Sequence, residues 1–157
     1  MPTEKGLWIM NIIHCDHSNV DLAVNAMVTI KCVEDGKPVE LATVTAMTTF
    51  LDNPYNHLLV AVDGSETVGY LIAYELQRPD REQSMMHLYD ITVVKKHRQK
   101  GIGTALIEQL KSICSTKPMM KMFVGTNRSN EAAVGLYQKT GAFPAEDTDA
   151  VGLTWFF

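Results

Sequence analysis

One strand, turn, helix and strand passage limits the fold of this chain more than any other feature. Residues 85–94, "MMHLYDITVV", have the apolar and β-branched content of a strand. An amphipathic helix is predicted from about 102 to 115, and a second strand, "MMKMFVG" (119–125), follows it. The passage therefore predicts a β-α-β unit within a three-layer, mixed α/β domain.

The segment before this unit predicts antiparallel strands. "HLLVAVDGSETVGYLIAYEL" (57–76) contains two β-rich runs joined by Asp63-Gly64, which is a strong hairpin signal. The other predicted elements are a strand (7–15), a helix (19–36) that ends at Gly36, a weaker helix (39–54) that Asn53-Pro54 terminates, a helix (130–139) closed by Gly141, and a β-rich end (151–157).

The length of 157 residues suits a single domain, which we expect to span 1–157, because the chain has no repeat or Pro/Gly/Ser linker. No apolar run reaches the roughly 20 residues of a membrane span, and the N-terminal segment lacks the features of a signal peptide. Three cysteines without paired spacing favour reduced thiols. We therefore expect a cytoplasmic protein that uses no membrane.

Charge is distributed unevenly along the chain. Residues 95–128 contain eight Lys or Arg residues and one acid, Glu108, so this stretch carries +7, whereas the whole chain carries −4 and the remainder −11. Such a block suits the binding of an anion within an acidic molecule, although a solvated helix face is an equally good explanation. Nucleic acid is not an expected partner, because the stretch lacks interleaved aromatic residues. "HCDH" (14–17) predicts no metal site, because contiguous strand residues point to alternate faces.

The most basic part of this stretch lies where the predicted helix begins. A helix N-terminus exposes about four unpaired backbone N–H groups at the positive end of the helix dipole. Gly101 and Gly103 lack a Cβ, so the backbone there is free to adopt positive φ and to approach a phosphate closely. Arg98 and Lys100 add cationic donors. The turn is therefore a candidate phosphate site.

Two common phosphate loops do not fit the turn. GxxxxGK[ST] is absent, and Leu106 stands where a dinucleotide fingerprint requires its third glycine. The stretch from Arg98 to Gly103 instead resembles the [RQ]-x-x-G-x-[GA] loop of the GNAT N-acetyltransferase family. Asn130, Leu136-Tyr137 and "KTGAF" (139–143) are similar to a second motif of that family, and the resemblance covers roughly residues 56–143.

The resemblance implies an α/β (α+β) fold with a mixed, mostly antiparallel sheet of about six to seven strands and helices on both faces. It also implies that strands 88–94 and 119–125 separate to admit the pantetheine arm of acetyl-CoA, the acetyl donor. Tyr137 is expected beside the sulfur as the general acid, because a phenol ordinarily titrates near pH 10. The implied cofactor contacts are the backbone of Thr92, Val93 and Val94, the turn residues Arg98, Gln99, Lys100, Gly101, Ile102, Gly103 and Thr104, and the side chains of Asn130 and Tyr137.

An amine acceptor arrives protonated and must lose a proton before it attacks a thioester directly, so the site needs a base. Asp90 is the first candidate, because a carboxylate within an apolar strand is costly to bury unless it is paired. Glu75, on the preceding strand, is the second. Each has a structural alternative, as a hydrogen-bond acceptor at a strand end.

A narrower resemblance concerns the acceptor. "LYDITVVKKHRQKGIGTALI" is similar to a stretch of GNAT aminoglycoside 3-N-acetyltransferases, and the pair Tyr89-Asp90 is its most specific element. This resemblance implies a polycationic acceptor modified at the 3-N position and a role in antibiotic resistance. Glu146, Asp147 and Asp149 are candidate contacts for the acceptor, whereas the first 55 residues show no match.

Other functions stay open. The acceptor could be a polyamine, a small metabolite amine, or a protein N-terminus or lysine. A non-catalytic sensor of acetyl-CoA is the other alternative. By analogy with the family, a homodimer is possible, with the apolar end "LTWFF" at the contact.

Overall fold

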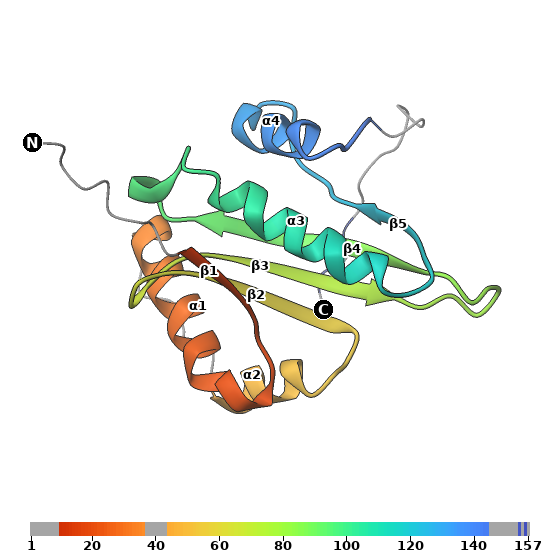
Figure 1. The fold of residues 1–157 in the computed structure, drawn as a ribbon, viewed down its shortest axis with the longest axis horizontal. Helices are drawn as coiled ribbons and strands as arrows, with labels where there is room; N and C mark the ends of the chain where they lie inside the picture. The colour runs from red at the N-terminus through yellow and green to blue at the C-terminus, as the bar shows by residue number, and fades with distance from the viewer. Residues whose placement is uncertain (1–9, 37–43, 145–153, 155, 157) are drawn as a thin grey trace, which may run out of the picture. The chain divides into compact units, whose positions relative to one another are not determined.

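The computed structural model describes residues 10–36, 44–144, 154 and 156. Its internal contacts divide the chain into two units, Met1–Gly125 and Thr126–Phe157. In the described residues the first unit contains one five-stranded sheet in the order β1-β2-β3-β4-β5, in which only β4 and β5 run parallel (Figure 1). The strands are β1 (Met10–His14), β2 (Asn56–Asp63), β3 (Glu66–Leu76), β4 (Ser84–Val93) and β5 (Met119–Phe123).

Helices cover both faces of this sheet, as predicted. The helices that pack on it are α1 (Val20–Asp35), α2 (Val44–Leu51) and α3 (Ile102–Ser115), and the short helices η1 (His17–Asn19) and η2 (Lys95–His97) precede α1 and α3 along the chain. Ala23, Ala26 and Ile30 of α1 share one buried cluster with Leu58, Val60 and Tyr70 of the sheet. Leu59 and Leu71 alternate with these strand residues and therefore point to the opposite face, where α3 lies. The predicted mixed α/β class is confirmed.

Most predicted boundaries agree with the structure. Helix α1 ends at Gly36, whose left-handed φ of 63° lets its N–H bond to the Cys32 carbonyl at 3.1 Å. The hairpin turns at Gly64, with φ of 60°. Helix α2 ends at Leu51, three residues earlier than the predicted limit of 54.

The number of strands is a correction. The described residues form five strands in the sheet, not six to seven. The expected last strand falls on 151–157, of which the structure describes only Thr154 and Phe156, and neither belongs to a strand. The rest of "LTWFF", with the dimer contact expected there, lies outside the described residues.

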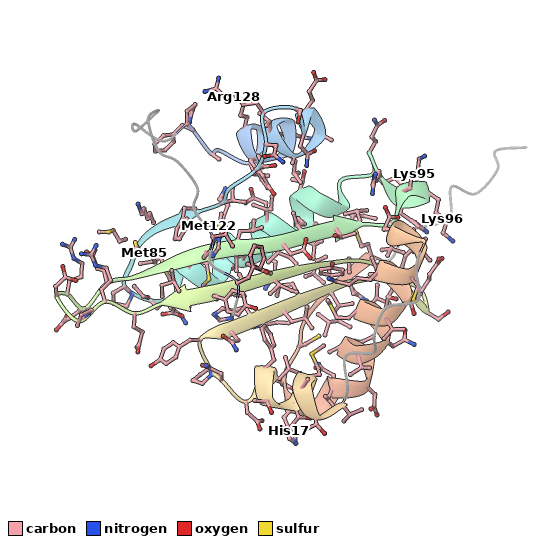
Figure 2. All side chains as sticks on the ribbon, turned by 180° about the vertical axis from the view of Figure 1, so that it is seen from behind. His17, Met85, Lys95, Lys96, Met122 and Arg128 are labelled. Atoms are coloured by element: carbon pink, nitrogen blue, oxygen red, sulfur yellow. The ribbon has the colours of Figure 1, made fainter. Side chains whose placement is uncertain are left out.

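Strand β4 has an irregular register on both of its edges. Against β3, Asp90 pairs with Ile72 and Leu88 pairs with Ala73, so Tyr89 is an extra residue in a β-bulge. Against β5, pairing runs from Ser84 to His87 and reaches no further in the described residues. Figure 2 labels Met85 and Met122 where the two strands pair, and Lys95 and Lys96 beyond the other end of β4. Within the part of the chain that the structure describes, one edge of β4 therefore has no strand partner over its last six residues.

The second unit contains α4 (Glu131–Lys139), which agrees with the predicted helix. The Asn130 side chain caps its N-terminus by accepting a hydrogen bond from the Ala133 N–H at 3.2 Å. Gly141, with φ of 98°, follows its C-terminus. Throughout the described ranges of both units, every helix is too short or too polar to cross a bilayer.

Candidate active site

The open edge of β4 agrees with the predicted separation of two strands. The pairing with β5 ends at His87 and Phe123, and β4 continues to Val93. Val94 was predicted to bind the cofactor through its backbone, but its N–H and its carbonyl are both already bonded within the protein. Its N–H donates to the Val68 carbonyl at 2.9 Å, and its carbonyl accepts from the His97 N–H at 2.8 Å. The open backbone available to a ligand is therefore that of β4 before Val94.

The turn after β4 leads into a helix N-terminus without a side-chain cap. Gly101 is the N-cap residue of α3 and has φ of 82°. Gln99 has φ of 60°, the one positive value among the described residues other than glycine. Gly103 was predicted to share this role, but positive φ in this turn occurs at Gln99 and Gly101. Because no side chain of the described residues caps α3, the amide groups of its first turn are available to an anion.

Glu34, at the end of α1, anchors the start of this turn. Its carboxylate accepts a hydrogen bond from the Lys95 N–H at 2.8 Å and another from the Arg98 guanidinium. Arg98 Nε also donates to the Val93 carbonyl at 2.8 Å. Two nitrogens of the predicted phosphate-binding arginine are thus engaged within the protein. In this structure Arg98 positions the turn.

A second carboxylate, Glu66 at the start of β3, holds the other side of the turn. Lys96 Nζ lies 2.6 Å from Glu66 Oε1, and His97 Nε2 lies 3.5 Å from Glu66 Oε2. The side chain of His97 is buried. The ion pair lowers the pKa of Glu66 chiefly through the hydrogen bond from Lys96. The basic turn is therefore tied to both α1 and β3.

Asp90 is held by a tyrosine that sequence analysis did not select. The buried Tyr70 hydroxyl donates to Asp90 Oδ2 at 2.7 Å, and Thr92 Oγ1 lies 3.4 Å from the same hydroxyl. Asp90 itself is half-buried. The arrangement fixes the carboxylate beside the open edge of β4. Tyr70 and Asp90 lie on different strands, 20 residues apart, so no local sequence pattern reveals the contact.

The bulge brings Tyr89 and Asp90 to the same face of the sheet. In a regular strand, neighbouring residues point to opposite faces. Here Tyr74 pairs with His87 and Ile72 pairs with Asp90, so His87 and Asp90 point to the same face of the sheet. Tyr89 is the extra residue in between, and it lies on this face together with Asp90. The Tyr89 ring packs edge to face on Tyr74, with centroids 5.4 Å apart. The predicted substrate pair therefore shares one surface.

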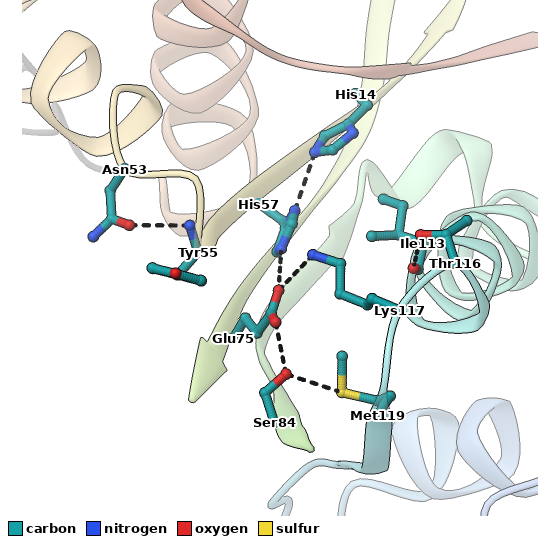
Figure 3. A network of polar contacts seen from close by, with 10 residues as sticks. All are labelled: His14, Asn53, Tyr55, His57, Glu75, Ser84, Ile113, Thr116, Lys117 and Met119. Carbon is teal, nitrogen blue, oxygen red and sulfur yellow. Dashed lines mark hydrogen bonds and ion pairs between the residues drawn. The ribbon is translucent and has the colours of Figure 1, made fainter. Parts of the chain in front are cut away.

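Glu75, the second candidate base, lies elsewhere. It is three residues beyond Ile72, the partner of Asp90, and so points to the opposite face. Glu75 Oε1 accepts from Ser84 Oγ and Oε2 from Lys117 Nζ, both at 2.6 Å (Figure 3). Burial raises the pKa of Glu75, but these donors outweigh it and lower the pKa below its ordinary value. Glu75 also lines a cavity of about 520 Å³ between the β3–β4 loop and the segment that connects α3 to β5. Glu75 is therefore part of a structural hydrogen-bond network and lies on the opposite face of the sheet from Asp90.

His57 and His14 extend this network across the sheet. His57 Nε2 lies 3.7 Å from Glu75 Oε2, and His57 Nδ1 lies 3.2 Å from His14 Nε2 (Figure 3). Burial lowers the pKa of His57, and the charges of His14 and Lys117 lower it further. The other residues of "HCDH" diverge from His14, since Asp16 accepts from Ser18 and His17 pairs with Asp52 at 3.0 Å.

Asn130 and Tyr137 belong to the second unit, so the structure does not relate them to β4 or to the turn. Asn130 Oδ1 is used in capping α4, and its amide nitrogen remains a donor. Tyr137 is half-buried on α4. Glu146, Asp147 and Asp149, the predicted acceptor contacts, lie outside the described residues.

Glu34 and Tyr70 are the residues that sequence analysis missed. Glu34 carried a weak signal, because an acidic side chain in the last turn of a helix opposes the helix dipole and so favours a cationic or N–H partner elsewhere. Tyr70 carried none, because a tyrosine within an apolar strand is ordinarily a core residue.

Comparisons with known proteins agree on the family. The model of the acetyltransferase (GNAT) family matches residues 24–142. Thialysine N-epsilon-acetyltransferase of Mus musculus is 31% identical over an alignment of 101 residues, and the match covers 59% of this chain and 59% of that protein. The chain covers between 39% and 59% of the length of the curated relatives with which it aligns.

Solved structures share the fold. Aminoglycoside acetyltransferase meta-AAC0020 from an uncultured soil metagenomic sample, crystallised with trehalose and with sisomicin, has a TM-score of 0.83 at 19% and 18% identity, over 94% of this chain and 96% of that one. Aminoglycoside acetyltransferase HMB0005, also from an uncultured soil sample, has a TM-score of 0.75 at 27% identity, over 92% of this chain and 99% of that one.

Proposed function

This chain belongs to the acetyltransferase (GNAT) family and is an acyltransferase, and from that membership we propose that it acetylates an aminoglycoside at the 3-N amine. The observation that carries the proposal is the position of Asp90, a tyrosine-bound carboxylate beside an open strand edge that leads into an uncapped helix N-terminus. The likeness to HMB0005, at 27% identity, supports the acceptor class.

Acetyl-CoA is the acetyl donor of the family, and the residues present fit it. The diphosphate requires N–H donors, which the turn from Gln99 to Thr104 supplies without a capping side chain. The pantetheine requires backbone partners, and in this proposal the Val93 N–H on the unpaired edge of β4 supplies one, while the Val93 carbonyl stays bonded to Arg98. Acetyl-CoA contributes a thioester, whose acyl carbon a neutral amine attacks directly.

Asp90 acts as the base in this proposal. Its Oδ2 already accepts the Tyr70 hydroxyl, so Oδ1 receives the proton of the acceptor ammonium. Tyr137 supplies a proton from its hydroxyl as the acid. Asn130 donates to the cofactor through its amide nitrogen, since its oxygen caps α4. Glu75 is left out of the chemistry, because three partners surround it on the opposite face.

The proposal treats residues 1–157 as one catalytic domain, because the family match crosses the boundary between the two units. It places the protein in the cytoplasm, which three free cysteines support. A homodimer and a role in aminoglycoside resistance belong to the same proposal. The thialysine relative supports a small amine as the alternative acceptor, where the resistance role does not apply.

A screen of acceptors tests the proposal. Release of the coenzyme A thiol from acetyl-CoA is followed with a panel of aminoglycosides, polyamines, thialysine and peptides. We expect release with aminoglycosides, and NMR of the product then identifies the acetylated nitrogen. If thiol is released only with thialysine or only with a polyamine, that amine is the acceptor and the aminoglycoside proposal is wrong. Binding of acetyl-CoA without release on any amine would favour a sensor.

A further inference from the structure

A continuous series of rings crosses the face of the sheet on which Asp90 lies. Phe50 at the end of α2, Tyr74 of β3, Tyr89 and His87 of β4, and Phe123 of β5 form this series, which we name the aromatic row. Successive ring centroids lie 5.8, 5.4, 6.0 and 4.7 Å apart. The first three contacts are edge to face and the last is stacked. Each ring is thus fixed by its neighbours.

Tyr89 is the accessible part of the row. It is 63% exposed, whereas the other four members are partly covered. At the far end, the ammonium group of Lys121 already lies 5.7 Å from the centroid of Phe123. A ligand therefore meets the row at Tyr89 and Tyr74. An exposed ring of this size, held by two others, is a preformed surface that needs no ordering when a ligand binds.

The bulge sets this surface next to the proposed base. Tyr89 and Asp90 are consecutive and share one face only because Tyr89 is the extra residue of β4. Among the described residues, Asp90 is the carboxylate adjoining Tyr89 along β4, and Tyr70 fixes it. A ligand whose ammonium group binds Asp90 would thus extend its carbon skeleton over Tyr89 and Tyr74.

We infer that the aromatic row binds the ring of a cyclic amine acceptor, whose flat C–H face lies on Tyr89 while its ammonium group meets Asp90; this inference rests on the proposed function. A rigid ring covers the aromatic surface without losing internal rotations, whereas a flexible chain must be ordered. Selectivity for a cyclic over a linear amine follows from the row. Asp90 binds the ammonium group, which both kinds of amine carry, and so does not distinguish between them.

Two diamines with the same nitrogen spacing and charge test the inference: cis-1,3-diaminocyclohexane and 1,3-diaminopropane. We expect the wild type to acetylate the cyclic diamine with at least tenfold higher kcat/KM. Tyr89→Leu should reduce this ratio to within about twofold of one, whereas Tyr89→Phe, which keeps the ring, should preserve it. Tyr55→Leu is the matched control, since Tyr55 is an exposed tyrosine outside the row. A wild type without preference, or a preference that survives Tyr89→Leu, overturns the inference.

Failure of the proposed function has a different signature. If no amine releases thiol from acetyl-CoA, the proposed function fails, and saturation-transfer NMR still tests the row. Binding of the cyclic diamine to the wild type and to Tyr89→Phe, with loss in Tyr89→Leu, supports the row as a binding surface. Equal binding to all three proteins, or binding to none of them, overturns it.

Discussion

At the scale of single residues, one hydrogen bond gives the proposed base its position. Tyr70 is 1% exposed and its hydroxyl donates to Asp90 Oδ2 at 2.7 Å. A hydrogen bond to a charged group contributes about 1.5–3 kcal/mol. The phenol therefore holds the carboxylate in one orientation beside the open edge of β4, and Tyr70 is a positioning residue for the reaction.

Tyr70→Phe tests this relation, because the substitution keeps the ring and removes the donor. We expect kcat to fall about tenfold, as expected from a hydrogen bond to a charged group, with the KM of acetyl-CoA unchanged. Asp90→Asn should lower kcat further, most of all at low pH, where more of the amine carries a proton. The double variant should be no slower than Asp90→Asn alone, because Tyr70 acts through Asp90. Additive losses in steady-state kinetics would give Tyr70 a separate role.

At the scale of elements, the junction of β3, β4 and α3 depends on a glycine. A Cβ on Gly69 would lie 3.0 Å from the Thr92 carbonyl oxygen and 3.4 Å from Ile102 Cγ2. The first of these atoms is backbone and cannot turn aside. Gly69 therefore allows β4 and the start of α3 to approach β3 closely.

Gly69→Ala should destabilise the protein by about 1–3 kcal/mol, because the strands must separate to accept the methyl group. Denaturant unfolding measures the change. Gly135→Ala is the matched control, since a Cβ there meets nothing within 4 Å and alanine raises helix stability by about 0.5–1 kcal/mol. Equal effects of the two substitutions would contradict the close packing at Gly69.

The contact between α1 and the basic turn is a second feature at this scale that bears on function. Glu34 binds the Lys95 N–H and the Arg98 guanidinium, and so connects a helix on the proposed acceptor face to the turn proposed to bind the diphosphate. Loss of this contact should leave the turn less ordered before the cofactor arrives.

Glu34→Gln should therefore weaken binding of coenzyme A about fivefold, the order expected for loss of one charge-assisted contact. Isothermal titration calorimetry measures the affinity. Glu108→Gln, which removes an exposed carboxylate paired with Lys111 on α3, is the control and should change little. Tighter binding in Glu34→Gln would mean instead that Glu34 withholds Arg98 from the phosphate.

The elements were largely predictable from sequence, whereas their irregularities were not. Helix periodicity and the capping glycine placed α1 and its end at Gly36, and Asp63-Gly64 placed the hairpin. The bulge at Tyr89 and the end of pairing at Phe123 depend on contacts between strands, which a single strand's sequence does not encode. The candidate site followed from motifs as far as β4 and the turn, but Tyr70 and Glu34 act through residues 20 and more than 60 positions away.

At the scale of the whole molecule, one polar network joins most of the sheet of the first unit. His14 of β1, His57 of β2, Glu75 of β3 and Ser84 of β4 are connected in sequence by contacts of 3.2, 3.7 and 2.6 Å, and Lys117 joins at Glu75. His57 and Glu75 are buried. Buried polar groups of this kind stabilise a fold while satisfied and destabilise it when one member changes charge.

The network should make the folded protein sensitive to mild acid. Burial and the charges of His14 and Lys117 hold the pKa of His57 below its ordinary value of 6.5. Below pH 6.5 the unfolded chain takes up a proton at this residue that the folded chain does not, so the free energy of unfolding falls as the pH drops toward the native pKa. His14, whose pKa burial also lowers, acts in the same direction. Glu75, with a pKa below its ordinary 4.5, adds a further loss only below that pH.

Thermal unfolding between pH 8 and pH 5 measures this sensitivity. We expect the Tm of the wild type to fall steadily below pH 6.5, and the Tm of His57→Gln, although lower at pH 8, to fall less over the same range. His17→Gln removes an exposed histidine and should follow the wild type. If His57→Gln and the wild type lose the same Tm between pH 7 and pH 5, the acid sensitivity lies outside the network, and His57 titrates alike in the folded and unfolded chain.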